Sequence, residues 1–189
     1  MLFATREILL DKLLSLPALI DTYQRGDSDF VLLANTWLQE LEQSLAQLRS
    51  PLTSLVARER ARVISAQDGL RDPSISEKVS RRRAVKMTTS LALGQVEAAM
   101  AGQLQTIDQK FDVWRDKLAQ FISVASGLVP IPLPPSEPRR EWLQLIWASW
   151  KQVEEARAMY NYLNTIMAPG DRLQLLGELL ENNLNGNGH

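Results

Sequence analysis

Arginine and lysine are the residues of this sequence with the clearest chemistry, because their side chains bind phosphate and carboxylate groups. The segment from Arg58 to Lys86 contains nine basic and four acidic residues. Its net charge is +5, which leaves −6 for the rest of a chain whose total is −1. The sequence predicts a docking surface there for a polyanion or an acidic partner. Its predicted members are Arg58, Arg62, Arg71, Lys78, Arg82 and Lys86.

Helical geometry selects among these residues. Successive residues of a helix point about 100° apart, so the three arginines 81–83 cannot all line one groove. Arg82 and Lys86 are four apart and share a face, which makes them the favoured pair. No aromatic residue lies between Arg58 and Lys86, and this argues against base stacking. The plain alternative is a solvated end whose charges are offset by nearby acids.

Catalytic residue patterns are missing from the sequence. Cysteine is absent and the one histidine is His189, which excludes thiolate chemistry and a Ser-His-Asp arrangement. Glycine-rich phosphate loops are absent as well. Glu178 and Glu181 share a helix face, but paired surface acids usually only contact solvent. We therefore predict no enzyme activity, no catalytic residue, no cofactor and no metal site.

The elements that position the basic residues are helices. The run 76–126 contains no proline, and its apolar residues recur at alternating steps of three and four, the heptad pattern of a coiled coil. That repeat comprises Leu104, Ile107, Phe111, Trp114, Leu118, Phe121 and Ala125. Period-two alternation is absent outside the proline-rich segment at 127–136, so no sheet is expected. The predicted fold class is all-α, an elongated antiparallel helical bundle with coiled-coil-like long helices.

The predicted organisation is a single bundle domain over residues 1–182. The six helical segments expected are 3–24 with a break or kink at Pro17, 29–49, 50–67, 76–126, 137–168 and 171–182. The apolar spacing also allows one kinked helix through Pro51. The domain divides into a long hairpin at 28–126 with its turn at 68–75, a proline-rich linker at 127–136 and C-terminal helices at 137–182, followed by a disordered tail at 183–189.

Two features of these helices predict contacts. Gly94, Ala98 and Gly102 form a small-residue stripe with a step of four. A glycine inside a helix costs about 1 kcal/mol relative to alanine, so we expect another helix to approach closely there. An internal crossing is the first interpretation, and a subunit interface or a helix bend are the alternatives. Leu143 and Trp147 lie beside the main apolar stripe of their helix and predict contact with the first helix or with a partner.

These observations favour a non-enzymatic helical adaptor, scaffold or accessory subunit of a larger protein assembly, acting through helix-face contacts. The alternative is a nucleic-acid-associated accessory subunit that docks phosphate through residues 58–86. A homodimer through the small-residue stripe or the Trp147 face is also predicted. The N-terminal sequence lacks the pattern of a signal peptide, and no window is apolar enough for a membrane span. We therefore expect a cytoplasmic protein.

Overall fold

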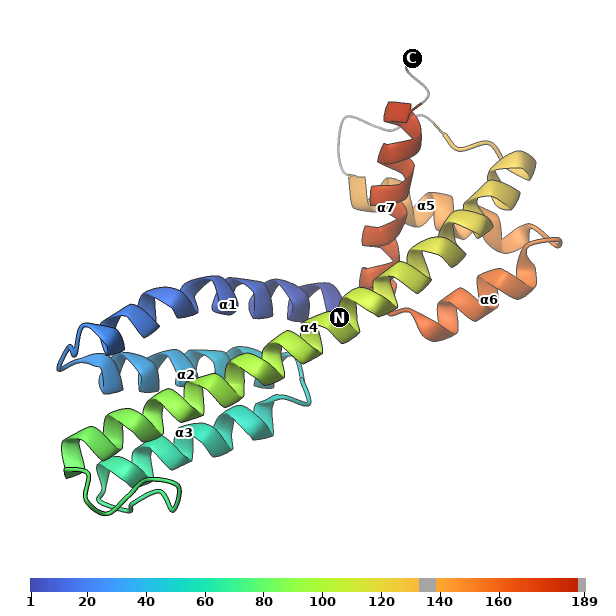
Figure 1. The fold of residues 1–189 in the computed structure, drawn as a ribbon. Coiled ribbons are helices and arrows are strands. Elements are labelled where there is room, and N and C mark those ends of the chain that lie inside the picture. The colour runs from blue at the N-terminus through green and yellow to red at the C-terminus, as the bar shows by residue number, and fades with distance from the viewer. Residues whose placement is uncertain (133–138, 187–189) are drawn as a thin grey trace. The chain divides into compact units, whose positions relative to one another are not determined.

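The computed structural model describes the backbone of residues 1–132 and 139–186, with side chains up to residue 181 in the last stretch. Every regular element in these ranges is helical, and no strand occurs in them (Figure 1). The longest helix has 48 residues. The predicted all-α fold of packed helices is confirmed. The elements are α1 (Leu2–Gln24), α2 (Phe30–Gln47), α3 (Thr53–Gln67), α4 (Arg81–Leu128), α5 (Arg139–Ser149), the 3-10 turn η1 (Trp150–Gln152), α6 (Arg157–Ile166) and α7 (Pro169–Gly186).

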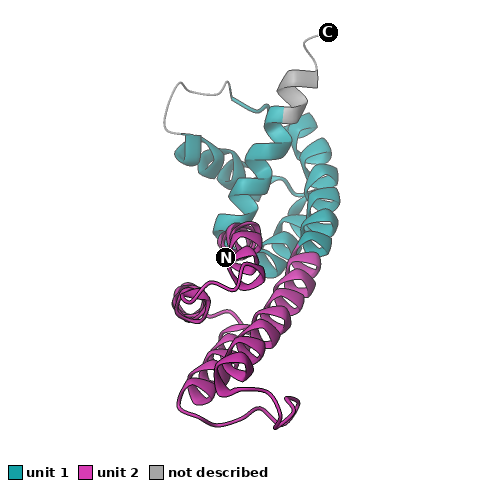
Figure 2. Cartoon of the chain, turned by 60° about the vertical axis from the view of Figure 1, so that its left-hand side comes forward, with its two compact units in different colours: residues 1, 108–189 teal, residues 2–107 magenta. Residues whose placement is uncertain are grey.

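The chain divides into two compact units, which Figure 2 distinguishes by colour. The N-terminal unit is Leu2–Ile107, and the C-terminal unit is Met1 with Asp108–His189. Helix α4 contributes residues to both. The single domain predicted over residues 1–182 stays a prediction.

The N-terminal unit consists of α1, α2, α3 and the first part of α4. Its buried apolar side chains come from all of these helices, and each contributes roughly 1.5–3 kcal/mol on burial. They include Leu9, Leu16, Phe30, Leu38, Leu41, Leu45, Val56, Val63, Leu93, Val96 and Met100. Trp37 Nε1 donates a hydrogen bond to Ser15 Oγ at 3.0 Å and ties α2 to α1. Of the break or kink predicted at Pro17, the break does not occur, because Pro17 lies inside α1.

Helices α2 and α3 are separate, and the alternative of one kinked helix through Pro51 is wrong. Arg49 has a φ of 53°. Ser50 N donates to Leu45 O at 2.9 Å and Arg49 N to Ala46 O at 3.0 Å. These bonds form a Schellman motif, which ends a helix with one left-handed residue. Helix α3 then packs on α2. The apolar spacing continues through Pro51 because both helices present an apolar stripe to the same core.

The connection between α3 and α4 is longer than the predicted turn at 68–75, and α4 begins at Arg81 rather than at the predicted Ser76. Gly69 follows α3 with a φ of 105°, in the left-handed region that glycine tolerates. Ser74 N donates to Asp72 Oδ1 at 2.9 Å, and Lys78 N donates to Ser76 Oγ at 3.3 Å. Such local side-chain bonds compete with helical hydrogen bonds. They account for the late start of α4.

The C-terminal unit contains the remainder of α4 together with α5, η1, α6 and α7. The single helix predicted over 137–168 is wrong, because the chain leaves helical geometry at Val153, with φ −75° and ψ 108°. This break lets Trp147 of α5 and Tyr160 of α6 both contact Phe121 of α4, with ring centroids 5.2 and 6.2 Å away. Leu145 of α5 is 68% exposed.

The ends of the C-terminal unit also differ from prediction. Pro169 starts α7, where proline is favoured because its missing N–H has no partner in a first turn. The helix runs to Gly186, so the backbone at 183–186 is helical where a disordered tail was expected. No proline or glycine interrupts residues 178–185, which lets the helix continue. Helix α4 likewise extends to Leu128, into the predicted linker. Residues 133–138 and 187–189 of the predicted linker and tail lie outside the described residues.

Candidate interaction surfaces

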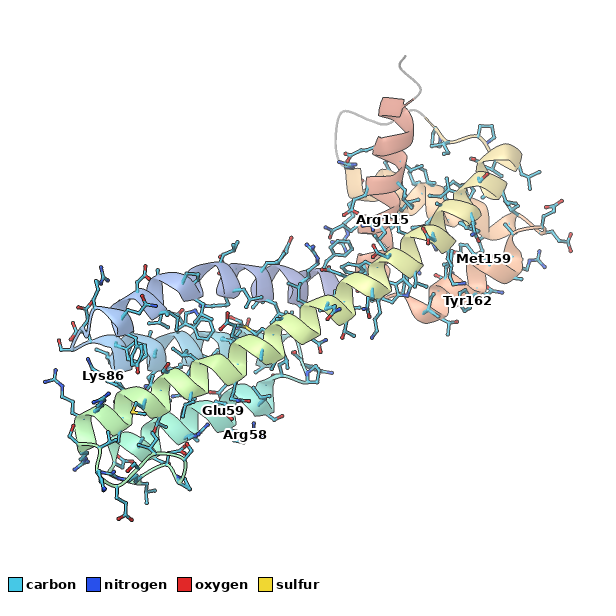
Figure 3. All side chains as sticks on the ribbon, in the orientation of Figure 1. Arg58, Glu59, Lys86, Arg115, Met159 and Tyr162 are labelled. Atoms are coloured by element: carbon cyan, nitrogen blue, oxygen red, sulfur yellow. The ribbon has the colours of Figure 1, made fainter. Side chains whose placement is uncertain are left out.

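Two basic residues near the start of α4 bind carbonyl groups at the ends of other helices. Lys86 Nζ donates to Gly26 O at 2.8 Å and Asp27 O at 2.6 Å, just beyond α1. Arg81 Nη2 donates to Gln67 O at 2.8 Å, at the last residue of α3. Carbonyls at helix C-termini carry partial negative charge, so cations there stabilise the helix. Figure 3 shows Lys86 on α4 within the N-terminal unit.

Arg58 and Arg62 form ion pairs with buried acids. Arg62 Nε lies 2.5 Å from Asp72 Oδ2, and its Nη1 lies 3.2 Å from Glu59 Oε2. Arg58 Nη2 is 2.9 Å from Glu59 Oε1 (Figure 3). The hydrogen bond from Arg62 lowers the pKa of Asp72 to about 2, and the same bond raises the pKa of Arg62. This network holds the α3–α4 loop against α3.

Only part of the predicted docking surface has free cationic groups. Arg71 closes the α3–α4 loop, donating to Ser76 O at 2.6 Å and Val79 O at 2.9 Å. Lys78 and Arg82 are exposed, and their side chains make no hydrogen bond or ion pair with any described residue; the same holds for Arg83. Of the favoured pair, Arg82 is therefore free and Lys86 has internal partners.

The small-residue stripe of α4 faces solvent. Gly94, Ala98 and Gly102 are all exposed. A Cβ atom added at Gly94 or Gly102 would meet no atom within 4 Å. The internal crossing expected from the sequence is wrong, because the buried side of α4 carries Leu93, Val96 and other apolar residues instead.

The stripe belongs to a wider uncharged surface, which we call the neutral α4 face. Its exposed members are Leu91, Gly94, Gln95, Ala98, Ala101, Gly102 and Gln105. Glu97 is the one charged residue among the 21 residues 87–107. The chain as a whole is 23% charged, which would give about five charges in such a segment. Sequence periodicity alone missed this face, although the local absence of charge could have identified it.

Leu143 and Trp147 lie inside the C-terminal unit. Trp147 stacks on Tyr160 of α6 with centroids 4.9 Å apart, and the Arg172 guanidinium lies 4.4 Å from its ring centroid. Burial lowers the pKa of Arg172. Leu143 Cδ1 lies 3.2 Å from the position that a Cβ atom on Gly177 of α7 would take. Both residues are therefore buried helix–helix contacts with α6 and α7, where the sequence had suggested the first helix or a partner.

An apolar cavity of about 500 Å³ lies between α5 and α7, lined in part by Leu143, Leu173 and Gly177. Two opposite charges at its rim, Arg139 and Glu181, form an ion pair with each other. The lining also contains Arg140 and Glu178, and Glu178 Oε2 lies 3.6 Å from Arg115 Nη2 of α4.

Neither a metal site nor a membrane-spanning helix is found in the described parts of the chain: no three His, Cys, Asp or Glu residues cluster suitably for a metal, and no helix there is long and apolar enough to cross a bilayer. Comparison with known proteins gave no match, since no protein family, curated protein or solved structure is significantly similar to this sequence.

Proposed function

We propose that this protein is a non-enzymatic helical adaptor or accessory subunit, and that it binds a helix of a partner protein on the neutral α4 face. The single observation that carries the proposal is the exposure of Gly94, Ala98 and Gly102 on a surface with one charge in residues 87–107. A cytoplasmic location belongs to the same proposal.

The composition of this face has a stability cost that the fold does not offset. Each glycine costs about 1 kcal/mol relative to alanine inside a helix, and no atom of the described residues lies within 4 Å of a Cβ added at Gly94 or Gly102. Solvent-facing helix positions are normally rich in Lys, Arg, Glu and Asp. Small uncharged side chains instead suit close packing of a second helix, since helix axes lie about 8–10 Å apart according to the side chains between them.

Bulky substitutions test the proposal. The double variant Gly94→Leu and Gly102→Leu fills the space a partner helix would occupy, while each leucine is a better helix former than glycine. We expect unchanged helicity by circular dichroism and loss of the complex that co-purifies with the wild-type protein from its host. Gly127→Leu is the matched control, because Gly127 also lies in α4 with no atom within 4 Å of an added Cβ. Equal loss in the control, or no loss in the double variant, would contradict the proposal.

The partner helix can also come from a second copy of this chain. Sedimentation of the purified protein at high micromolar concentration separates the cases. A dimer that the double leucine variant dissociates assigns the face to self-association. A monomer assigns it to a different protein.

A second candidate function is docking of nucleic acid or an acidic protein through the free cations at the start of α4. Arg82 and Arg83 stand in its first turn, where the positive end of the helix dipole disfavours cations, and neither has a partner among the described residues. With Lys78 they leave three exposed cations beside one loop. Binding through them should weaken steeply as salt rises, and Arg82→Gln with Arg83→Gln should remove most of that salt dependence.

A further inference from the structure

Helix α1 carries apolar residues on its exposed side as well as on its buried side. Its buried side chains include Leu9, Leu16 and Leu19, and the helix packs on α2. A helix at the surface of a protein normally has a polar outer side, whereas a helix that is apolar all round is normally buried all round. The outer side of α1 is therefore more apolar than contact with solvent requires.

The exposed side of α1 forms one stripe, which we call the α1 outer face. Apart from Pro17, its members recur at alternating steps of four and three, which places them on one side of the helix. Leu14 lies in the middle of the stripe and is 80% exposed. The α1 outer face comprises Glu7, Asp11, Leu14, Pro17, Ala18 and Asp21, all of them exposed.

The charged members of the α1 outer face are all acidic. The side chains of Glu7, Asp11 and Asp21 form no ion pair or hydrogen bond with any described residue. Lys12 does not neutralise them, because its Nζ atom lies 2.8 Å from Glu40 Oε2 of α2. The apolar middle of the face thus has unpaired carboxylates on both sides of it along the helix. Complementary charge on a partner is therefore basic.

The carboxylates argue against two other occupants of this face. A second copy of the chain that docked through the same face would bring acids against acids, because a two-fold interface pairs a surface with itself. An anionic membrane surface would repel the acids as well, since the lipids that attract proteins electrostatically select basic segments.

We propose that the α1 outer face binds a basic amphipathic helix of a partner protein. Leu14, Pro17 and Ala18 contact the apolar side of that helix, and its lysines or arginines pair with the acids. The stripe from Glu7 to Asp21 spans about 21 Å, which matches a partner helix of about four turns. This surface lies on α1 rather than on the neutral α4 face, so the proposal goes beyond the proposed function and does not depend on it.

Fluorescence anisotropy with two labelled synthetic peptides tests this surface. Both peptides are amphipathic helices of about 14 residues, four turns long, with leucine on one side and either lysine or glutamate on the other. The wild-type chain should bind the Leu/Lys peptide at least about tenfold more tightly than the Leu/Glu peptide, because opposite charges across an interface attract and like charges repel. The double variant Asp11→Lys and Asp21→Lys should reverse this preference.

Substitution of the central leucine tests the apolar part of the face. Leu14→Ser should weaken binding of the Leu/Lys peptide about tenfold, since the buried contact of one leucine is lost. Leu145→Ser is the matched control and should bind as wild type does, because Leu145 of α5 is also highly exposed, at 68%. The double variant Gly94→Leu and Gly102→Leu should bind the peptide as wild type does, which separates this surface from the neutral α4 face.

Circular dichroism of each variant shows whether it folds, and the charge-reversal variant carries the test if Leu14→Ser does not. The proposal is overturned if wild type binds both peptides equally, or if Leu14→Ser and the charge-reversal variant both bind as wild type does. Equal weakening by Leu145→Ser also overturns it, because binding would then not be specific to α1. Phosphatidylcholine vesicles provide the last comparison: vesicle binding that Leu14→Ser abolishes would assign the face to a membrane instead.

Discussion

At the scale of single residues, Lys86 joins α4 to the end of α1. Its hydrogen bonds offset the side-chain entropy that is lost when Lys86 is held in place. Its ammonium group donates to the carbonyls of Gly26 and Asp27. Lys86→Gln should lower the free energy of unfolding by about 1–2 kcal/mol, because two charge-assisted hydrogen bonds are lost at a partly exposed site. Urea unfolding measures this. Arg82→Gln is the control and should change stability by less than about 0.5 kcal/mol; equal effects in the two variants would contradict the assigned role of Lys86.

Asp72 should make the stability of the protein depend on pH. Its pKa is lowered from 3.8 to about 2 by Arg62 and Ser74, so the folded protein holds fewer protons than the unfolded chain between those values. The stabilisation is complete above about pH 5 and is lost as pH falls towards 2, with a size of at most about 2.5 kcal/mol.

Asp72→Asn removes this contribution. Urea unfolding of wild type and Asp72→Asn at several pH values below 5 should give two curves that converge as pH falls, because the wild type alone loses the Asp72 stabilisation. Parallel curves would show that the Arg62–Asp72 ion pair adds nothing to stability.

The sequence predicted the charge of the segment from Arg58 to Lys86, but it did not predict which of its cations are free to bind a partner. The excess of positive charge between Arg58 and Lys86 is evident from the sequence. The role of each cation is not evident, because a cation four residues from another on a helix can face solvent or the end of a neighbouring helix. Lys86 and Arg62 found internal partners across 59 and 10 residues of chain. Such distant contacts leave no local pattern.

At the scale of elements, α4 carries glycines whose replacement should stabilise the helix. Gly94→Ala and Gly102→Ala should each stabilise the protein by up to about 1 kcal/mol, since alanine is the better helix former and the added Cβ meets no atom. Differential scanning calorimetry would show the midpoint rise by a few degrees. Destabilisation by either variant would mean that the stripe is covered within the chain.

Gly69→Ala, in the same unit, should destabilise the protein where Gly94→Ala and Gly102→Ala should stabilise it. Gly69 has a φ of 105°, and an added Cβ would lie 3.3 Å from Arg81 Nη2. We expect this variant to lower stability by about 1 kcal/mol or more, because alanine is strained in left-handed backbone. Urea unfolding measures the loss, and unchanged stability would contradict it. The contrast separates glycines needed for the fold from those of the neutral α4 face.

The sequence predicted which segments are helical better than it predicted the residues at which the helices end. The glycine stop at Gly69 and the long proline-free run of α4 follow from local chemistry. The ends at Arg49 and Val153 do not, because an arginine in left-handed backbone and a valine in extended backbone are both stabilised by packing on either side. In each case the apolar spacing continued across the break, since both flanking helices share one core.

At the scale of the whole chain, the protein combines an uncharged helix face with a set of basic side chains used mainly inside the fold. The sequence excludes thiol and histidine chemistry in residues 1–188. Within the described residues the structure adds an exposed face whose glycines the fold does not require. The proposed role in protein–protein contact follows from that face.

The most direct measurement is photo-crosslinking from the centre of the neutral α4 face in the protein's own host. A benzophenone amino acid placed at Ala98 should capture one discrete partner, which the Gly94→Leu and Gly102→Leu substitutions abolish. The same group at Ala61, an exposed alanine of α3, should capture no discrete product. Equal patterns from Ala98 and Ala61, or capture from Ala98 that survives both leucine substitutions, would contradict the proposal that this face binds a partner helix.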